Sequence, residues 1–233
     1  RSNIMHKRNV LTIVLTIAML LIASPAMAHW VGAAGGGDGV SYEDPLNWSG
    51  GAVEDRAVFD ATMGTPSPTS ITGGGVNHLG FTLRNGTVLT YSGGDLAFSD
   101  TTIISGADTI LNVTGGSLAT STRHGFEVNS GAILSIKTGG FFNGRDTVVR
   151  GTDGTSLSLI EIDGGTALFN PDTNGYGTPQ YNVALGVGQN GQDGRFDVKS
   201  GVAMFRSQGL TEPGRHPGMY IGDAGMTATP SNG

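Results

Sequence analysis

The sequence predicts an all-β protein, a right-handed parallel β-helix (β-solenoid) that follows a cleaved signal peptide. The first observation is a phrase that occurs five times, in which alternating apolar residues lead into glycine. The second is its spacing, with steps of 22, 23, 26 and 36 residues, a range typical of solenoids. The third is that 40 of the 233 residues are glycine, placed regularly between apolar runs, which favours ordered corners over disorder. The phrases begin at Leu89, Leu111, Leu134, Ile160 and Phe196.

Alternation within each phrase predicts strands with one side inward and one outward. Antiparallel hairpins could give the same alternation, but Asn85-Gly86 is the one tight Asn-Gly signal between strands in this region. Stacked parallel coils explain more, because they repeat the same inward residues and use glycine where the backbone turns a corner at positive φ. No segment after the signal peptide keeps apolar residues at helical spacing without glycine, so no helix is predicted there.

Residues 1–28 are predicted to be a signal peptide, with residues 1–4 lying upstream of the initiator Met5. A basic start precedes an apolar run from Val10 to Ile22, and Ala26-Met27-Ala28 supplies the small residues that signal peptidase requires. The run is short for a bilayer span, which disfavours the alternative of an uncleaved anchor and predicts a mature part without a membrane span. We therefore expect export, to the extracellular space or the surface of a bacterial cell.

Residues 29–51 are expected to cap the first coil. This segment is rich in turn-forming residues and holds both tryptophans, Trp30 and Trp48. A solenoid has to cover the apolar end of its first coil, and atypical terminal units do this. The alternative is that the two rings form a stacking platform for sugars. Because aromatic rings are most often used in cores, the cap is the favoured interpretation.

Residues 52–233 are expected to form the coils. The step of 36 residues is interpreted as one coil plus an insertion at residues 170–182, and insertions on solenoids gather on the face that binds. Tyr176 and Tyr181, in that insertion, are therefore the candidate ligand-binding residues. Laying Leu185 over Ile221 predicts that a new coil begins near the end of the sequence, so further repeats and an anchoring or sorting segment are expected beyond it.

The charge of the chain argues against nucleic acid as a partner, and its lack of cysteine excludes stabilisation by disulfide bonds. The net charge is −6 at pH 7, and the predicted signal peptide contributes basic residues but no acidic ones. No basic run follows Arg8, so a nucleic-acid partner is not expected, because phosphate binding needs clustered Lys and Arg. The chain has no cysteine, so backbone ladders rather than disulfides must hold the coils together.

The sequence offers little that predicts cofactor chemistry or catalysis. The histidines of the mature part have no second histidine or carboxylate at metal-ligand spacing, so a zinc or iron site is not expected; they are His29, His78, His124 and His216. Calcium is the one ion with candidate ligands, in Asp-Gly turns at Asp38, Asp153 and Asp193. Asp-Gly is an ordinary turn pair, and known calcium loops are absent, so no cofactor is predicted.

Two stretches carry a family resemblance. One is Trp30-Val31-Gly32, followed by Asp44-Pro45-Leu46-Asn47-Trp48-Ser49 and Asp55-Arg56-Ala57-Val58-Phe59; the other is residues 185–198 with Ile221-Gly222-Asp223-Ala224-Gly225. They resemble secreted bacterial β-solenoid proteins with autotransporter-associated strand repeats or a PEP-CTERM type sorting signal. The proline usual before the first strand of those proteins is missing around Ala52 and Val53. The resemblance implies a structural or adhesive surface protein and brings no catalytic residues with it.

The sequence therefore predicts an exported structural or adhesive solenoid without catalytic activity. Polysaccharides or cell-surface glycans are its expected partners, and the oligomeric state is not predicted. The alternative is a polysaccharide lyase or glycoside hydrolase of the pectin-lyase-like β-helix type, which would need paired carboxylates or a base beside a metal. The outward candidates for that chemistry are Arg145, Asp146, Arg150, Glu161 and Asp163. A solvated charged face is the simpler explanation of the same residues.

Overall fold

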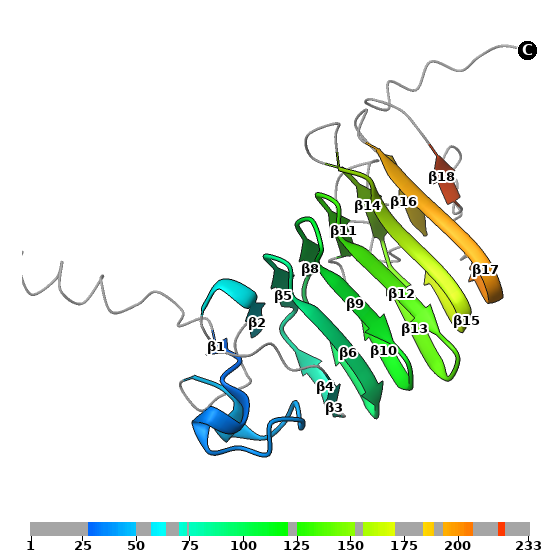
Figure 1. Ribbon diagram of the computed structural model, residues 1–233. Coiled ribbons are helices and arrows are strands. Elements are labelled where there is room, and N and C mark those ends of the chain that lie inside the picture. The colour runs from blue at the N-terminus through cyan, green and yellow to red at the C-terminus, as the bar shows by residue number, and fades with distance from the viewer. Residues whose placement is uncertain are drawn as a thin grey trace, which may run out of the picture.

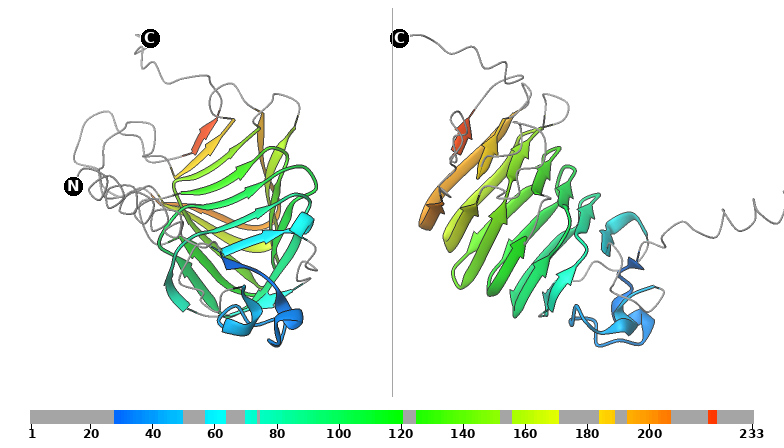
Figure 2. Two further views of the ribbon diagram at one scale, coloured as in Figure 1. Left: turned by 90° about the vertical axis from the view of Figure 1, so that its left-hand side faces the viewer. Right: turned by 180° about the vertical axis from the view of Figure 1, so that it is seen from behind.

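The strands stack in parallel, coil upon coil, as Figure 1 shows. This arrangement confirms the predicted β-helix. The computed structural model describes residues 28–49, 57–63, 70–73, 75–120, 125–151, 156–170, 184–188, 193–206 and 219–221. The N-terminal segment lies at one end of the stack and the strands β17 and β18 lie at the other. Seen from its end and from behind in Figure 2, the stack has its strands around a central core.

Eight parallel strands form the first face of the solenoid. They follow one another along the stack in sequence order, each from the next coil. These strands are β1 (Ala28–His29), β2 (Ala57–Asp60), β5 (Phe81–Arg84), β8 (Thr102–Ser105), β11 (Phe126–Asn129), β14 (Thr147–Arg150), β16 (Leu185–Val187) and β18 (Met219–Ile221).

The second and third faces are joined into one sheet by strands that cross a corner. The second face contains β3 (Ile71–Thr72), β6 (Val88–Gly93), β9 (Ile110–Val113) and β12 (Ile133–Lys137). The third face contains β4 (Gly75–His78), β7 (Asp95–Phe98), β10 (Gly116–Thr120) and β13 (Gly140–Arg145). The long strand β15 (Ser158–Asn170) pairs first with β12 and then with β13, and β17 (Gly194–Phe205) follows it around the same corner.

The register confirms the alignment of the five phrases. Leu89 pairs with Leu111, Leu111 with Leu134, Leu134 with Ile160, and Ile160 with Phe196. On the neighbouring strands, Arg145 pairs with Asn170 and Thr147 with Leu185. The extra residues of the longest step therefore lie between Asn170 and Leu185, at the corner from the third face to the first, as predicted.

One predicted register is wrong. The sequence alignment placed Leu185 over Ile221, whereas the structure pairs Leu185 with Met219 and Val187 with Ile221. Both registers keep apolar residues on the same side, because a shift of two residues leaves the alternation of a strand unchanged. The hydrophobic pattern could not separate them.

The core is a column of inward side chains that continues from coil to coil. Each face contributes two inward positions per strand, and nearly all are fully buried up to β15. Aromatic rings meet in it edge to face, within one coil for Phe126 and Phe142 (ring centroids 5.0 Å apart) and between successive coils for Phe142 and Phe169 (5.9 Å). Edge-to-face pairs of this kind stabilise the core beyond the apolar area that they bury.

Glycine turns the corner between the second and third faces, as the phrases predicted. Gly94 and Gly116 have φ values of 91° and 67°. A Cβ atom at Gly116 would lie 2.1 Å from the carbonyl oxygen of Gly94, so a side chain is excluded there for steric reasons as well. At this corner, the backbone of each coil therefore contacts the backbone of the preceding coil directly.

The N-terminal segment consists of β1 and two short 3₁₀ turns, η1 (Gly32–Gly35) and η2 (Pro45–Asn47). A third short turn, η3 (Ala61–Met63), follows β2. Ala28, the last residue of the predicted signal peptide, lies in β1 and pairs with Ala57 of β2. The segment therefore joins the first face directly through backbone pairing.

Candidate functional site

The outer side of the second face carries ladders of like residues, one residue from each coil. An aliphatic ladder runs through Val88, Ile110, Ile133 and Leu159, which are paired in register. Beside it runs a polar ladder of Thr90, Asn112, Ser135 and Glu161. We call the outward residues of β6, β9, β12 and the first half of β15 the ladder surface. These outward side chains are partly or well exposed, apart from Ser135, which is 1% exposed.

The charged residues of the ladder surface lie on β12 and β15, namely Lys137, Glu161 and Asp163. Glu161 accepts a hydrogen bond from the Ser135 hydroxyl on one carboxylate oxygen (2.7 Å) and pairs with the Lys199 ammonium on the other (2.6 Å). The bond from Lys199 is the main cause that lowers the pKa of Glu161 below its usual value. Arg195 and Asp197 form a second pair on β17 (2.7 Å). The outward residues of β6 and β9 carry no charge.

The structure does not bring the predicted catalytic candidates together in one site. Glu161 and Asp163 lie on the outer side of the second face. Arg150 ends β14 on the first face, where it pairs with Glu127 (3.3 Å). Arg145 and Asp146 lie at the corner between the third and first faces, where Asp146 is buried, so its prediction as an outward residue is wrong. Among the described residues, no group of three or more His, Cys, Asp or Glu could hold a metal ion.

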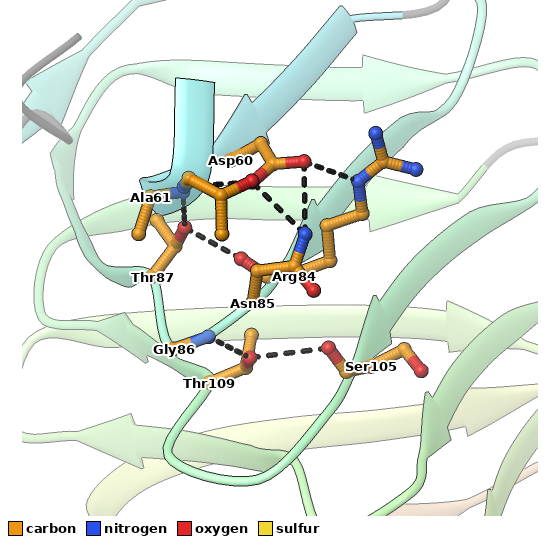
Figure 3. A network of polar contacts seen from close by, with 9 residues as sticks. Asp60, Ala61, Arg84, Asn85, Gly86, Thr87, Ser105 and Thr109 are labelled. Atoms are coloured by element: carbon orange, nitrogen blue, oxygen red, sulfur yellow. Dashed lines mark hydrogen bonds and ion pairs between the residues drawn. The ribbon is translucent and has the colours of Figure 1, made fainter. Parts of the chain in front are cut away.

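Asp60 forms the densest polar contact of the first face, shown in Figure 3. Its carboxylate accepts hydrogen bonds from Arg84 Nε (2.6 Å), from Asn85 Nδ2 (2.9 Å) and from both the backbone N–H and the hydroxyl of Thr62. Burial by itself would raise the pKa of Asp60, but these donors, led by Asn85, hold it well below its usual value. Because every donor belongs to this chain, Asp60 ties the first coil to the second.

A ladder of buried hydroxyls lines the corner from the first face to the second. Thr109 Oγ1 accepts from Gly86 N of the preceding coil (3.0 Å) and donates to the Ser105 carbonyl of its own coil (3.1 Å). Thr87 does the same with Ala61 N and the Arg84 carbonyl. Ser158, two coils beyond Thr109, repeats the pattern with Gly131 N and the Arg150 carbonyl. Ala132 takes the intervening place and has no hydroxyl.

The calcium candidates do not form an ion site among the described residues. Asp38 uses its carboxylate on its own loop, accepting from the backbone N–H groups of Val40 and Ser41, from Asn47 Nδ2 and from the Ser41 hydroxyl. These bonds, with that hydroxyl as the largest cause, lower the pKa of Asp38. Asp193 offers its carbonyl to Gly151 N (2.5 Å). Asp153 lies outside the described residues.

The two tryptophans are buried rather than displayed. Trp30 and Trp48 are each 3% exposed, with ring centroids 5.0 Å apart, and both contact Phe59 of the first coil. Tyr42, which the sequence interpretation did not include, packs on Trp48 at 5.1 Å and accepts the indole N–H of Trp48 on its carbonyl (2.7 Å). In this arrangement the rings offer no open platform to a sugar.

Tyr176 and Tyr181 lie outside the described residues, as do His124 and His216. Their roles stay predictions. The polar features that sequence reasoning missed are the hydroxyl ladder and Asp60. The ladder did leave a signal, since Thr87, Thr109 and Ser158 each stand two residues before the leading apolar residue of a phrase.

Searches for a matching family model, a related curated protein and a similar solved structure found no match. No helix in the described part of the chain is long and apolar enough to cross a membrane.

Proposed function

We propose that this protein is an exported structural or adhesive surface solenoid without catalytic activity. Its expected partners are polysaccharides or cell-surface glycans, met by the outward sides of the coils and by the insertion between Asn170 and Leu185. Parallel coils held in register give a rigid scaffold with repetitive, flat outer surfaces. A surface of this kind suits contact with an extended polymer or with a neighbouring molecule.

The observation that carries the proposal is the pairing of two outward carboxylates, those of Glu161 and Asp197. A glycoside hydrolase needs a carboxylic acid whose pKa is raised, so that it can protonate the leaving oxygen. Glu161 has the opposite environment, because Lys199 and Ser135 occupy its two oxygens and its pKa is lowered. Asp197 on the neighbouring strand is held by Arg195. These groups are paired in the way that structural surface charges are paired.

Retention on immobilised glycans tests the adhesive part of the proposal. The exported protein should be retained on at least one member of a panel of neutral and acidic polysaccharides, and released by the free polymer. Replacing both Tyr176 and Tyr181 with alanine should reduce retention if the insertion makes the contact. Full retention of this double variant would remove the two tyrosines from the proposed binding surface. No retention of the wild-type protein on any polymer would contradict the adhesive role.

A further inference from the structure

We propose that the ladder surface is a self-association surface, on which a second copy of this chain packs antiparallel, face to face. The proposal rests on the proposed function and deepens it by naming one partner of the structural surface. It comes from three features: the exposed aliphatic ladder, the absence of charge on β6 and β9, and the way the ladders match when the surface is laid against itself.

The aliphatic ladder is unusual for an outward position. Val88 is 45% exposed, and Ile110, Ile133 and Leu159 are partly exposed above it in successive coils. A single exposed aliphatic side chain needs no explanation, but a continuous row along four coils forms an apolar strip beside a polar ladder. Strips of this kind, bordered by polar residues, mark interaction surfaces.

The chemistry of the ladder surface favours protein over sugar at this strip. The outward residues of β6, β9, β12 and the first half of β15 include no aromatic ring, which is the side chain that best covers a sugar face. A second copy also has to approach despite the net negative charge on each chain. The uncharged outer side of β6 and β9 is a surface where such an approach costs little repulsion.

The ladders are complementary to themselves under a two-fold axis that runs parallel to the strands between β9 and β12. Such an axis reverses the order of the coils in the second copy but keeps positions along the strands unchanged. Each ladder therefore faces the same ladder of the partner subunit. Val88 then faces Leu159 of the partner subunit, and Ile110 faces Ile133 of the partner subunit. The backbones of two sheets that pack face to face lie about 10 Å apart, and the facing side chains are buried between them.

The polar positions match under the same axis. Thr90, a hydroxyl donor, faces Glu161 of the partner subunit, and Ser92 faces Asp163 of the partner subunit. Thr114 faces Lys137 of the partner subunit. These positions follow from the strand pairing of the polar ladder and of Lys137 with Asp163, continued by one residue on β6 and β9. No pair of like charges meets, and an uncharged side chain faces each carboxylate.

Sedimentation equilibrium of the exported protein over a concentration series tests the proposal. We expect a reversible dimer. Ile110→Lys, which places an unpaired charge in the aliphatic strip, should raise the dissociation constant at least about tenfold. Ser117→Lys adds the same charge to the outer side of the third face in the same coil. This control should change the dissociation constant less than about twofold. Circular dichroism checks that each variant keeps its strand signal.

Opposite charges at one exposed position test the register without touching the apolar strip. Ser92→Lys faces Asp163 of the partner subunit and should tighten the dimer about twofold to fivefold, whereas Ser92→Asp should weaken it by a similar factor.

Monomers at all concentrations would overturn the proposal, and so would equal effects of Ile110→Lys and Ser117→Lys. Val198→Lys, at the exposed last coil, provides a competing arm. If it dissolves the dimer while Ile110→Lys does not, the copies meet end to end and the proposal is wrong. Because these measurements contain no glycan, their outcome is separate from the retention test of the proposed function.

Discussion

Asp60 acts as a single carboxylate that links two coils through donors from both. Its side chain is 2% exposed, and it receives Arg84 and Asn85 from the second coil while it holds Thr62 in its own. A buried charge is tolerated only when its lone pairs are used. The importance of Asp60 therefore lies in the number of donors that would lose their acceptor if it were changed.

Replacing Asp60 with Asn keeps the size of the side chain and places an NH₂ group among donors. We expect the free energy of unfolding at pH 7 to fall by about 1–3 kcal/mol, since Arg84 and Asn85 are left without a full acceptor. Denaturant unfolding followed by circular dichroism measures this change. Arg195→Gln, which removes an exposed partner of Asp197, serves as the control and should have a much smaller effect.

The same carboxylate predicts acid dependence. Burial opposes ionisation of Asp60, but its hydrogen bonds keep the folded-state pKa below the unfolded value of about 3.9. The stabilisation is therefore complete above that unfolded pKa and is lost as the pH falls through the lower folded-state pKa. Below about pH 4, the stability of the wild type should decline more steeply than that of the Asp60→Asn variant. Parallel declines would show that Asp60 does not contribute.

Replacing a buried threonine with valine should have opposite effects on stability at Thr102 and at Thr109. The Thr102 hydroxyl is buried in the core and has no hydrogen-bond partner among the described residues, whereas the Thr109 hydroxyl bonds two coils. Thr102→Val should stabilise the protein by about 1 kcal/mol, because a polar group that cannot be satisfied is removed. Thr109→Val should destabilise it by about 1–3 kcal/mol. Thermal unfolding of both variants distinguishes the sites, and a loss of stability in both would contradict this account of Thr102.

At the scale of the element, corners connect neighbouring coils in addition to the strand pairing. The hydroxyl ladder joins each coil to the one before it at the corner from the first face to the second, and Ala132 leaves one place empty. Each hydroxyl that bonds two coils in this way contributes about 0.5–1.5 kcal/mol to the free energy of unfolding. The corners are therefore sites where small changes alter stability.

Ala132→Ser should complete the ladder. The new hydroxyl would stand between the Asp108 N–H of the preceding coil and the Asn129 carbonyl of its own, by analogy with Thr109. We expect a gain of about 0.5–1.5 kcal/mol in the free energy of unfolding. Ala132→Val adds volume without a hydroxyl and should destabilise, because Ala132 is fully buried. Similar effects of Ser and Val would mean that volume, not hydrogen bonding, decides this position.

Trp48→Ala tests the predicted cap at residues 29–51. Loss of this buried ring should destabilise the N-terminal coil by about 3–5 kcal/mol, through lost contacts with Trp30, Tyr42 and Phe59. Since coils of a solenoid interact mainly with their neighbours, hydrogen exchange should speed up in β2 and β5 before β12. Uniform acceleration along the whole stack would argue against a local capping role.

At the scale of the whole molecule, repetition made the register predictable. Leu89, Leu111, Leu134, Ile160 and Phe196 were aligned correctly because each stands in the same place of a recurring phrase. The short repeat at residues 219–221 was misaligned by two residues, because alternation looks the same after that shift.

The outward surface was less predictable than the core. The alignment of the phrases stacks Glu161 on Asp197 correctly, but it does not show which outward side chains bond to one another diagonally. Lys199 meets Glu161 across 38 positions, and no local pattern marks that pair. Likewise, the burial of Trp30 and Trp48 against Phe59 depends on how the N-terminal segment folds back, which alternation does not encode.

The most direct test of the central claim is an assay for product release on the polysaccharides that retain the protein. Reducing ends and unsaturated ends are both measured over time, for the wild type and for Glu161→Gln. We expect retention with no release above buffer for either protein. Release by the wild type would contradict the absence of catalytic activity, and its loss in Glu161→Gln would identify the solenoid as a carbohydrate-active enzyme that uses this carboxylate.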